Sequence, residues 1–412
     1  MEKNIFLLLG GNKLNFGILK KFKNLGYRVF VVDWNEHPQM TGDKHYRIDV
    51  KDSAAIIQAL KQDHVFDKVA FAYSSIDLAV PSVAALNRAF GLQTISDGAL
   101  KNAVSKANMT ETWARAGLLN RISKRYTAWA ADIVEFNKTC KLIIKPDNSA
   151  SSRGITIIDK NSPVDTVKSA FEKALREATD KTVVVEEFVE GTEFTVEMLG
   201  DGLGNVCVYG ISKKAHTQNT NNNKIAVKLH YNCIPEDLQQ KIAAYAIRCY
   251  KALGFSSSLG HLEVLLTANG VLSPVEIGAR SSGFIASDLV DIVSGRDFLV
   301  DTMNVLNGGK VMNGLHPQTG FSSMYFFYDF PANSKIVKEG TLLDFVSPKI
   351  ISRYFDRTNL TLNRHFNKID NDNARVGFEI LQGPQNIMTE AYIAQKEQEM
   401  LHFMLEGESH AV

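Results

Sequence analysis

Two glutamates lie on either side of a turn signal in the middle of the chain. Within residues 261–277, Asn269 and Gly270 form the dipeptide most typical of a two-residue β-hairpin loop. With that loop, Glu263 lies directly opposite Glu276 on the same face of the hairpin. Two facing carboxylates repel each other unless a cation lies between them, and Mg²⁺ prefers such oxygen ligands. The spacing therefore predicts a divalent-metal site; the alternative is a pair of exposed glutamates on a solvated face.

The rest of this hairpin supports the same arrangement. The residues that alternate with the two glutamates are apolar and predict a buried opposite face: Leu262, Val264, Leu266, Val275 and Ile277. Pro274 weakens the ladder, because proline has no N–H to donate. Arg280 follows Glu276 by four residues, which places another cation at the same site.

A loop of small residues follows a lysine that ends an apolar strand. Lys145 precedes the loop, which contains Ser151, Ser152 and Gly154. Backbone N–H groups, hydroxyls and cations of such a loop can surround a polyphosphate. It is not a Walker A loop, because the lysine comes before the loop and GxxxxGK[ST] is absent. Taken alone, the loop is equally consistent with a surface turn.

An acidic turn follows a second apolar strand, at residues 183–188. The backbone of a hinge at this place can hydrogen-bond adenine, and Glu193 can accept hydrogen bonds from ribose hydroxyls. Acidic residues are also common at strand ends, so this segment alone does not define a nucleotide site.

The first 95 residues predict a parallel sheet covered by helices. Apolar runs at residues 5–9, 27–33 and 68–73 alternate with helical patterns, as in βαβ units. Gly26 stands where a helix C-cap glycine belongs. The glycines after the first strand do not fit GxGxxG, which argues against the alternative of a dinucleotide-dependent oxidoreductase.

The middle of the chain predicts an α+β, largely antiparallel region. Its strands are rich in β-branched residues and cover residues 141–145, 155–159, 183–188, 194–199 and 206–212. One helix is expected to start with Ser162 as its N-cap and Pro163 at N1, and a longer one follows Pro235. Beyond residue 311, shorter strands at 322–327, 349–355 and 375–381 precede a helix at about 388–405, and residues 219–223 suggest a surface loop.

Composition narrows the class of protein. A chain of 412 residues with 45% hydrophobic and 22% charged residues predicts two or three globular domains. A net charge of +1 gives no general attraction to nucleic acid or to an anionic membrane. The four cysteines form no CxxC pair and are expected to be free thiols. No apolar run approaches the ~18 residues of a spanning helix, so a cytoplasmic location is the default prediction.

Taken together, these segments resemble the ATP-grasp superfamily, and within it the carboxylate–amine ligase branch. That branch includes L-amino acid ligases, phosphoribosylglycinamide synthetase, biotin carboxylase and the large-chain modules of carbamoyl-phosphate synthetase. The resemblance covers roughly residues 1–310. Five segments occur in the family's order: Ser105 with Lys106, Lys145 with its loop, residues 186–193, Glu263, and residues 276–283.

The resemblance implies a role at the nucleotide for each matching residue. Lys106 and Lys145 would hold the ATP phosphates, and Glu193 would bind the ribose. The other ATP-binding positions are those of the loop and the adenine hinge: Ser151, Ser152, Gly154, Glu186, Glu187, Phe188 and Val189. The loop is rich in serine where many members are rich in glycine.

The resemblance also implies the metal and substrate sites. Glu263 and Glu276 would bind one or two Mg²⁺ or Mn²⁺ ions, and Arg280 would act in catalysis by steadying the transferred phosphate. The expected substrate-binding residues are His261, Ser281, Ser282 and Gly283. The family often has asparagine two residues after the second glutamate, whereas this chain has Gly278, so the number of metal ions stays open.

The implied fold is α/β plus α+β, an ATP-grasp fold in three domains. Residues 1–95 would form a Rossmann-like parallel-sheet domain, and residues 96–310 an ATP-grasp domain with antiparallel ATP-binding lobes. A small mobile lobe is expected at about 123–190 of that domain. Residues 311–412 would form a small C-terminal α+β domain.

The implied function is an ATP-dependent carboxylate–amine ligase that forms an amide or peptide bond through an acyl phosphate and releases ADP. An L-amino acid ligase is the preferred member, because residues 280–283 look most like that branch. The alternatives are an ATP-grasp ligase or carboxylase of nucleotide or cofactor metabolism, and a non-catalytic nucleotide-binding module. The expected partners are small-molecule carboxylate and amine substrates and a second copy in a homodimer, with neither nucleic acid nor membrane.

Several other polar residues have two interpretations. His216 and His230 are proton-transfer groups or ordinary surface or core histidines, whereas His261 shares a strand face with Glu263. Lys213 and Lys214 end a middle strand, where they reach a carboxylate substrate or lie in solvent.

Overall fold

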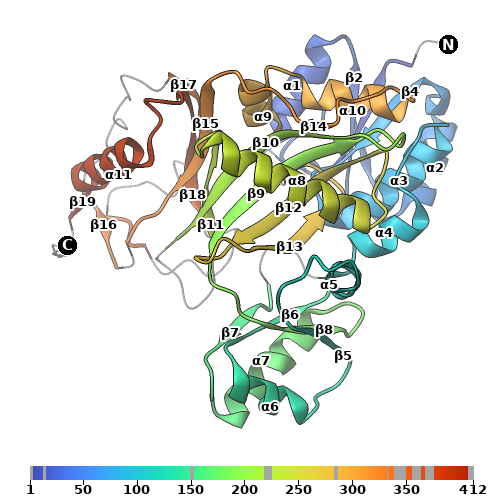
Figure 1. Ribbon diagram of the computed structural model, residues 1–412. Coiled ribbons are helices and arrows are strands. Elements are labelled where there is room, and N and C mark those ends of the chain that lie inside the picture. The colour runs from blue at the N-terminus through green and yellow to red at the C-terminus, as the bar shows by residue number, and fades with distance from the viewer. Residues whose placement is uncertain are drawn as a thin grey trace.

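The computed structural model describes residues 3–12, 15–148, 153–217, 225–282, 286–331, 333–337, 349–354, 363–366 and 375–406. Figure 1 shows a large body of sheets and helices, from which a smaller sheet with its own helices extends at the bottom of the view. In the part of the chain so described, no helix is long and apolar enough to cross a membrane.

The N-terminal strands form the predicted parallel sheet, in the order β3-β2-β1-β4. Its strands are β1 (Ile5–Leu9), β2 (Arg28–Asp33), β3 (Lys44–Arg47) and β4 (Val69–Tyr73). Its helices are α1 (Phe16–Asn24), α2 (Ser53–Gln62) and α3 (Val80–Ala89). Every residue of β1 and of β4 is buried, as expected for strands covered on both faces. Ligands of such sheets bind beyond the carboxyl ends of the strands.

The central sheet is antiparallel along its main path, in the order β13-β12-β9-β10-β11-β15-β18-β17. Its first five strands are β13 (Leu272–Gly278), β12 (Ser258–Leu266), β9 (Thr192–Gly200), β10 (Val206–His216) and β11 (Ala226–Tyr231). The short strand β14 (Gly314–Leu315) pairs with β10 in parallel. This confirms the predicted antiparallel middle region.

Helices cover both faces of the central sheet. On one face, α8 (Glu236–Ala252) packs Ile242, Cys249 and Tyr250 against apolar strand residues. Toward the N-terminal sheet, α9 (Ala286–Ser294) and α10 (Phe298–Leu306) contribute to one apolar cluster that also contains β1. Two short helices, α4 (Asp97–Ala103) and α5 (Lys106–Arg115), lead into the smaller sheet.

The smaller sheet has the order β5-β8-β6-β7. Its strands are β5 (Ser123–Tyr126), β8 (Val183–Glu187), β6 (Leu142–Pro146) and β7 (Thr156–Ile158), and its helices are α6 (Asp132–Thr139) and α7 (Val164–Glu177). The predicted N-cap of α7 is wrong. Pro163 is the N-cap, and the Ser162 hydroxyl instead donates a hydrogen bond to the Asp159 carbonyl, 2.8 Å away. The serine stabilises the preceding turn rather than the helix end.

The C-terminal strands extend the central sheet. They are β15 (Phe321–Tyr328), β18 (Val376–Pro384) and β17 (Lys349–Tyr354), and β15 pairs directly with β11. The helix α11 (Glu390–Met404) and the short pair β16 (Lys335–Ile336) and β19 (Leu405–Glu406) complete this end. The loop expected at residues 219–223 lies outside the described residues. The three domain boundaries stay predictions.

The four cysteines are free thiols, as predicted. Cys207 and Cys249 are buried, whereas Cys140 and Cys233 are half-buried. Burial raises the pKa of Cys207 and of Cys249 to about 12, so both remain protonated and unreactive at neutral pH.

Candidate active site

The two predicted glutamates do face each other, although the hairpin differs from the predicted one. Glu263 of β12 pairs with Glu276 of β13, but next to the turn Leu266 pairs with Leu272, one residue out of the predicted register. The loop is therefore longer than two residues and is closed by the Thr267 N–H, which donates to the Val271 carbonyl at 3.0 Å.

A bulge restores the predicted pairing. The register shifts between Glu263 and Val264, and the additional residue on the other strand is Val275, next to Pro274. The bulge removes Val275 from the buried face where it was expected, whereas Leu262 and Ile277 lie in the core as predicted. Proline is common at β-bulges, because it has no N–H to donate to a regular ladder.

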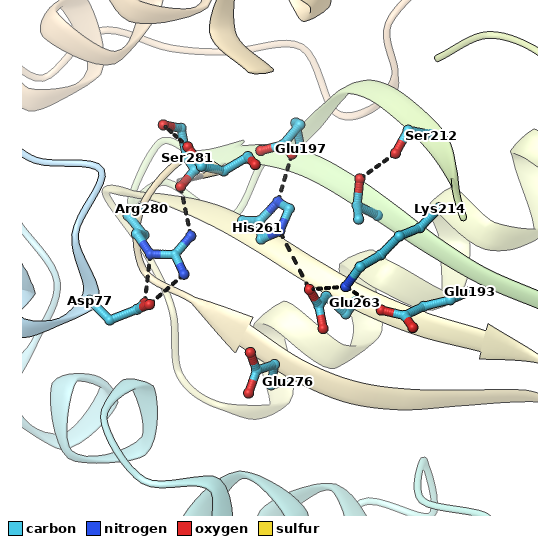
Figure 2. A network of polar contacts seen from close by, with 12 residues as sticks. Asp77, Glu193, Glu197, Ser212, Lys214, His261, Glu263, Glu276, Arg280 and Ser281 are labelled. Atoms are coloured by element: carbon cyan, nitrogen blue, oxygen red, sulfur yellow. Dashed lines mark hydrogen bonds and ion pairs between the residues drawn. The ribbon is translucent and has the colours of Figure 1, made fainter. Parts of the chain in front are cut away.

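One face of the central sheet is a row of polar side chains (Figure 2). On β9, Glu193, Thr195 and Glu197 alternate with the buried apolar residues Phe194 and Val196. In the neighbouring strand β12, His261 pairs with Glu197 and Glu263 with Thr195. The polar face thus brings together residues from four strands: Glu193, Thr195, Glu197, Ser212, Lys214, His261, Glu263 and Glu276.

Lys214 of β10 joins two of these carboxylates. Its Nζ lies 2.6 Å from an oxygen of Glu193 and 2.6 Å from an oxygen of Glu263. His216 Nε2 contacts the other oxygen of Glu193 at 3.2 Å. Burial opposes ionisation of Glu193, but Lys214 and His216 outweigh it and lower the pKa of this carboxyl. Of the two interpretations of Lys214, the structure supports a place in the site.

Glu197 was missed by the sequence analysis. Its side chain is fully buried, and its Oε1 accepts hydrogen bonds from His261 Nδ1 at 2.6 Å and from the Tyr231 hydroxyl at 3.1 Å. His261 Nε2 lies 3.9 Å from Glu263, so one imidazole ring links the two carboxylates (Figure 2). The missed signal is the alternation of polar and apolar residues along 192–198, which predicts a strand with one polar face.

The pKa values of Glu263 and Glu276 are shifted in opposite directions. Burial raises the pKa of Glu263, and the negative charges of Glu193 and Glu276 raise it further. Lys214 lowers this pKa, but its effect is smaller than the sum of the others. Burial also opposes ionisation of Glu276, but Lys106 at 3.1 Å and Lys145 outweigh it and lower its pKa to about 2. A cation between the two carboxylates would stabilise the ionised form of both.

The two predicted phosphate lysines lie on the same side of the site. The N–H of Ala107, next to Lys106 at the start of α5, donates to the Asp147 side chain at 2.6 Å, which holds α5 against the end of β6. Lys145, the last but one residue of β6, is buried beside Glu186 at 2.9 Å. Lys106 and Lys145 thus lie beside Glu276 and Glu186, although these residues are far apart in the sequence.

Glu186 lies in the predicted adenine hinge, but its carboxylate belongs to an ion-pair cluster. It contacts Lys145 at 2.9 Å and Arg121 at 3.1 Å, and only 2% of its side chain is exposed. Burial opposes ionisation, but the two cations outweigh it and lower the pKa of Glu186 to about 2. The carboxylate thus holds Lys145 in place. The next hinge residues, Glu187, Phe188 and Val189, are half-buried at the end of β8.

Arg280 makes contacts that the sequence did not predict. Its Nε and Nη2 donate to the two oxygens of Asp77 at 2.6 and 2.5 Å, and its Nη1 donates to the Ser281 carbonyl at 2.9 Å. Asp77 follows β4, so the guanidinium links the carboxyl edge of the parallel sheet to the central sheet (Figure 2). Ser281 also forms a side-chain hydrogen bond with the Tyr73 hydroxyl.

The remaining predicted residues fall into two groups. Ser282 is buried beside Ser281, and Gly154 has φ +75°, a left-handed conformation that favours glycine. Ser151, Ser152 and Gly283 lie outside the described residues.

The residues of the site fit a magnesium–nucleotide complex. Within the described ranges, no group of three or more histidines, cysteines, aspartates or glutamates is placed to hold a metal ion by itself. Mg²⁺ usually takes one or two carboxylates and completes its shell with water and substrate phosphates. Glu263 and Glu276 supply such a pair, and three lysines nearby (Lys106, Lys145 and Lys214) suit the phosphates.

Comparison with known proteins agrees with this chemistry. Residues 138–288 match the sequence model of the ATP-grasp domain. Over 227 residues the chain is 26% identical to the D-alanine–D-alanine ligase of Cupriavidus metallidurans, a match that covers 52% of this chain and 67% of that protein.

Two solved structures share the fold over almost the whole chain. An L-amino acid ligase from Bacillus licheniformis has a TM-score of 0.75 at 15% identity and covers 99% of this chain and 100% of its own. The biotin carboxylase domain of the Hydrogenobacter thermophilus 2-oxoglutarate carboxylase, solved with MgADP, has a TM-score of 0.71 at 14% identity and covers 99% and 91%.

Residues 138–288 thus match an ATP-grasp domain, and the chain as a whole resembles ligases in sequence and carries the same fold as an L-amino acid ligase. The ATP-grasp domain indicates an enzyme that uses ATP, and the similar proteins named above include two ligases.

Proposed function

We propose that this protein is a ligase that activates the carboxylate of an amino acid as an acyl phosphate and passes the acyl group to an amine, with release of ADP and phosphate. The observation that carries the proposal is the polar face of the central sheet. There the facing pair Glu263 and Glu276 lies beside Lys106, Lys145 and Lys214. The names of the similar ligases support an amide or peptide product.

In phosphoryl transfer, the lysines and the glutamates would have different roles. Lys106 and Lys145 would bind and orient the phosphates, and Glu193 at the start of β9 would bind the ribose. Mg²⁺ held by Glu263 and Glu276 would supply charge neutralisation at the phosphates when bound. Because Gly278 brings no side-chain ligand, we propose that this pair is the protein's whole contribution to the metal shell.

Arg280 would steady the acyl phosphate. The Asp77 and Ser281 contacts use three of the five N–H groups of its guanidinium. The other two have no partner among the described residues and would donate to an oxyanion. A cation fixed in this way needs little reorganisation as charge develops in the transition state. The lobe of β5 to β8 would close over the nucleotide and keep water from the activated acid.

An oxygen-isotope experiment tests the proposed chemistry. The enzyme is incubated with ATP, an amine and pools of amino acids whose carboxylates carry ¹⁸O, and the products are analysed by mass spectrometry. Acyl-phosphate chemistry must transfer one carboxylate oxygen to the released phosphate. Label in AMP would show adenylation instead, and label in neither product would leave a carboxylase or a non-catalytic module as the better hypothesis. The cytoplasmic location and the homodimer stay predictions from the sequence.

A further inference from the structure

Among the described residues, one oxygen of the Glu197 side chain has no hydrogen-bond partner. The side chain has no exposed surface, and its Oε1 takes both hydrogen bonds, from His261 and from Tyr231. Its Oε2 is buried, and no group in the part of the chain that the structure describes donates to it. A buried carboxylate oxygen without a donor is unfavourable, because it has lost its hydration without replacement.

The other carboxylates of the site differ from Glu197 in one respect. Each has the ammonium or guanidinium of a lysine or arginine within 3.1 Å: Asp77 with Arg280, Glu186 with Lys145, Glu193 and Glu263 with Lys214, and Glu276 with Lys106. Among the described residues, Glu197 has only an imidazole and a phenol as partners. It is thus the most buried acid of the site and the one without a permanent cation.

The position of Glu197 brings this acid close to the proposed reaction centre. The His261 ring contacts Glu197 on one side and lies 3.9 Å from Glu263 on the other, so a single imidazole ring separates the two carboxylates. Figure 2 shows Glu197 and Ser281 on the same side of the network, above His261. Ser281 is bonded to Tyr73 at the carboxyl end of β4, the edge of a parallel sheet where ligands bind.

We propose that Glu197 Oε2 binds the protonated α-amino group of the substrate whose carboxylate is activated. The inference rests on the proposed function and narrows the donor to an amino acid. His261 and Tyr231 hold Oε1 and so leave Oε2 to the ligand. In an α-amino acid, one carbon atom joins the carboxylate to the ammonium group. In the site, one imidazole ring separates Glu197 from the proposed metal ligand Glu263, so the ammonium would bind Glu197 while the carboxylate lies toward the metal.

Pairs of acids with the same skeleton test the inference. Wild-type enzyme and Glu197→Gln are assayed for ADP release with alanine and propionate, leucine and 4-methylpentanoate, and glutamate and glutarate, with hydroxylamine as acceptor. The wild type is expected to prefer the amino acid of the pair that fits its pocket. Glu197→Gln, which keeps shape but loses the charge, is expected to raise the KM for that amino acid about 10- to 100-fold and to leave the KM for ATP unchanged.

A second buried glutamate provides a matched control. Glu379 on β18 is also buried and accepts a hydrogen bond from a tyrosine, Tyr328, at 2.7 Å, but it is not part of the polar face. Glu379→Gln should leave the preference for the amino acid intact. Glu197→Asp, which keeps the negative charge, should restore part of that preference.

The outcomes separate the two proposals. If the wild type uses propionate as well as alanine, and likewise for the other pairs, the role of Glu197 is wrong but the ligase stands. The same holds if Glu197→Gln keeps the wild-type preference. If no acid of any pair supports ADP release, the proposed function fails and the inference with it.

Discussion

The strands β1 and β9 show two different ways to position functional groups. All five residues of β1 are apolar and buried, because helices cover both faces of its parallel sheet. Along β9, by contrast, Glu193, Thr195 and Glu197 form a polar face while the alternate residues enter the core. The parallel sheet therefore offers polar groups only at or beyond the ends of its strands, where Tyr73 and Asp77 lie, whereas the antiparallel sheet offers them along its length.

The two regions also differ in the number of charged groups that they bury. The polar face buries several carboxylates, which are stable there because cations lie next to most of them. In the N-terminal sheet, stability comes from apolar burial. Substitutions at the site and in the N-terminal core should thus separate activity from stability. Three experiments test this, and another tests an ion-pair cluster of the smaller sheet.

The largest effect is expected for Glu276→Gln on the polar face. Removal of one of the two facing carboxylates should lower metal affinity and reduce kcat by at least about 10³-fold, with the fold unchanged. Steady-state ADP release at several Mg²⁺ and Mn²⁺ concentrations measures this, and circular dichroism monitors the fold. Turnover close to that of the wild type would refute the metal assignment.

Arg280→Ala should reduce kcat about 10²- to 10³-fold with little change in the KM for ATP. The guanidinium is proposed to act on charge that develops during transfer, so its loss affects the transition state rather than nucleotide binding. Arg296 makes a similar two-point contact with Asp301 away from the site, and Arg296→Ala should leave kcat unchanged. A rise in the KM for ATP at constant kcat would assign Arg280 to nucleotide binding instead.

Glu186→Gln should destabilise the smaller sheet by about 3–5 kcal/mol at pH 7, because Lys145 and Arg121 would lose their buried partner. The pKa of Glu186 is lowered to about 2 from 4.5, so its stabilising contribution is complete above about pH 4.5 and is lost as the pH falls toward 2.

Urea unfolding between pH 2.5 and 7 measures this slope in both proteins. The variant should show a flatter dependence of the free energy of unfolding on pH in the acidic range. Glu190→Gln, at an exposed position just after the same strand, should behave like the wild type. An unchanged acidic slope in Glu186→Gln would mean that the ion pair does not stabilise the fold.

Leu7→Ala in β1 should cost about 2–5 kcal/mol of stability and leave the kcat of the folded enzyme unchanged. Leu7 is fully buried, whereas Leu203 is 57% exposed, so Leu203→Ala should change stability by less than about 0.5 kcal/mol. Thermal unfolding together with ADP release compares the two. A large loss of kcat in folded Leu7→Ala would show that the N-terminal core and the polar face are coupled.

The local sequence predicted most of the elements near the site. Strands at residues 5–9, 183–188 and 206–212 and the helix at 53–61 were expected from their periodicity, and the structure has them within a few residues. The facing pair Glu263 and Glu276 was also expected, but from a two-residue loop and a regular ladder. The loop is longer than that, and a bulge at Val275 shifts the register back, so the two glutamates still face each other. Loop length and bulges depend on tertiary packing, which periodicity does not contain.

The sequence by itself determined which segments are buried strands and which residues carry charge, because alternation and composition are local properties of the chain. The tertiary structure alone decided which charges meet. Asp77 reaches Arg280 across 203 residues, Lys214 reaches Glu263 across 49, and His261 reaches Glu197 across 64. No spacing rule relates such partners, since their distance depends on strand order and on the packing of one sheet against another, and these contacts give each functional side chain its orientation.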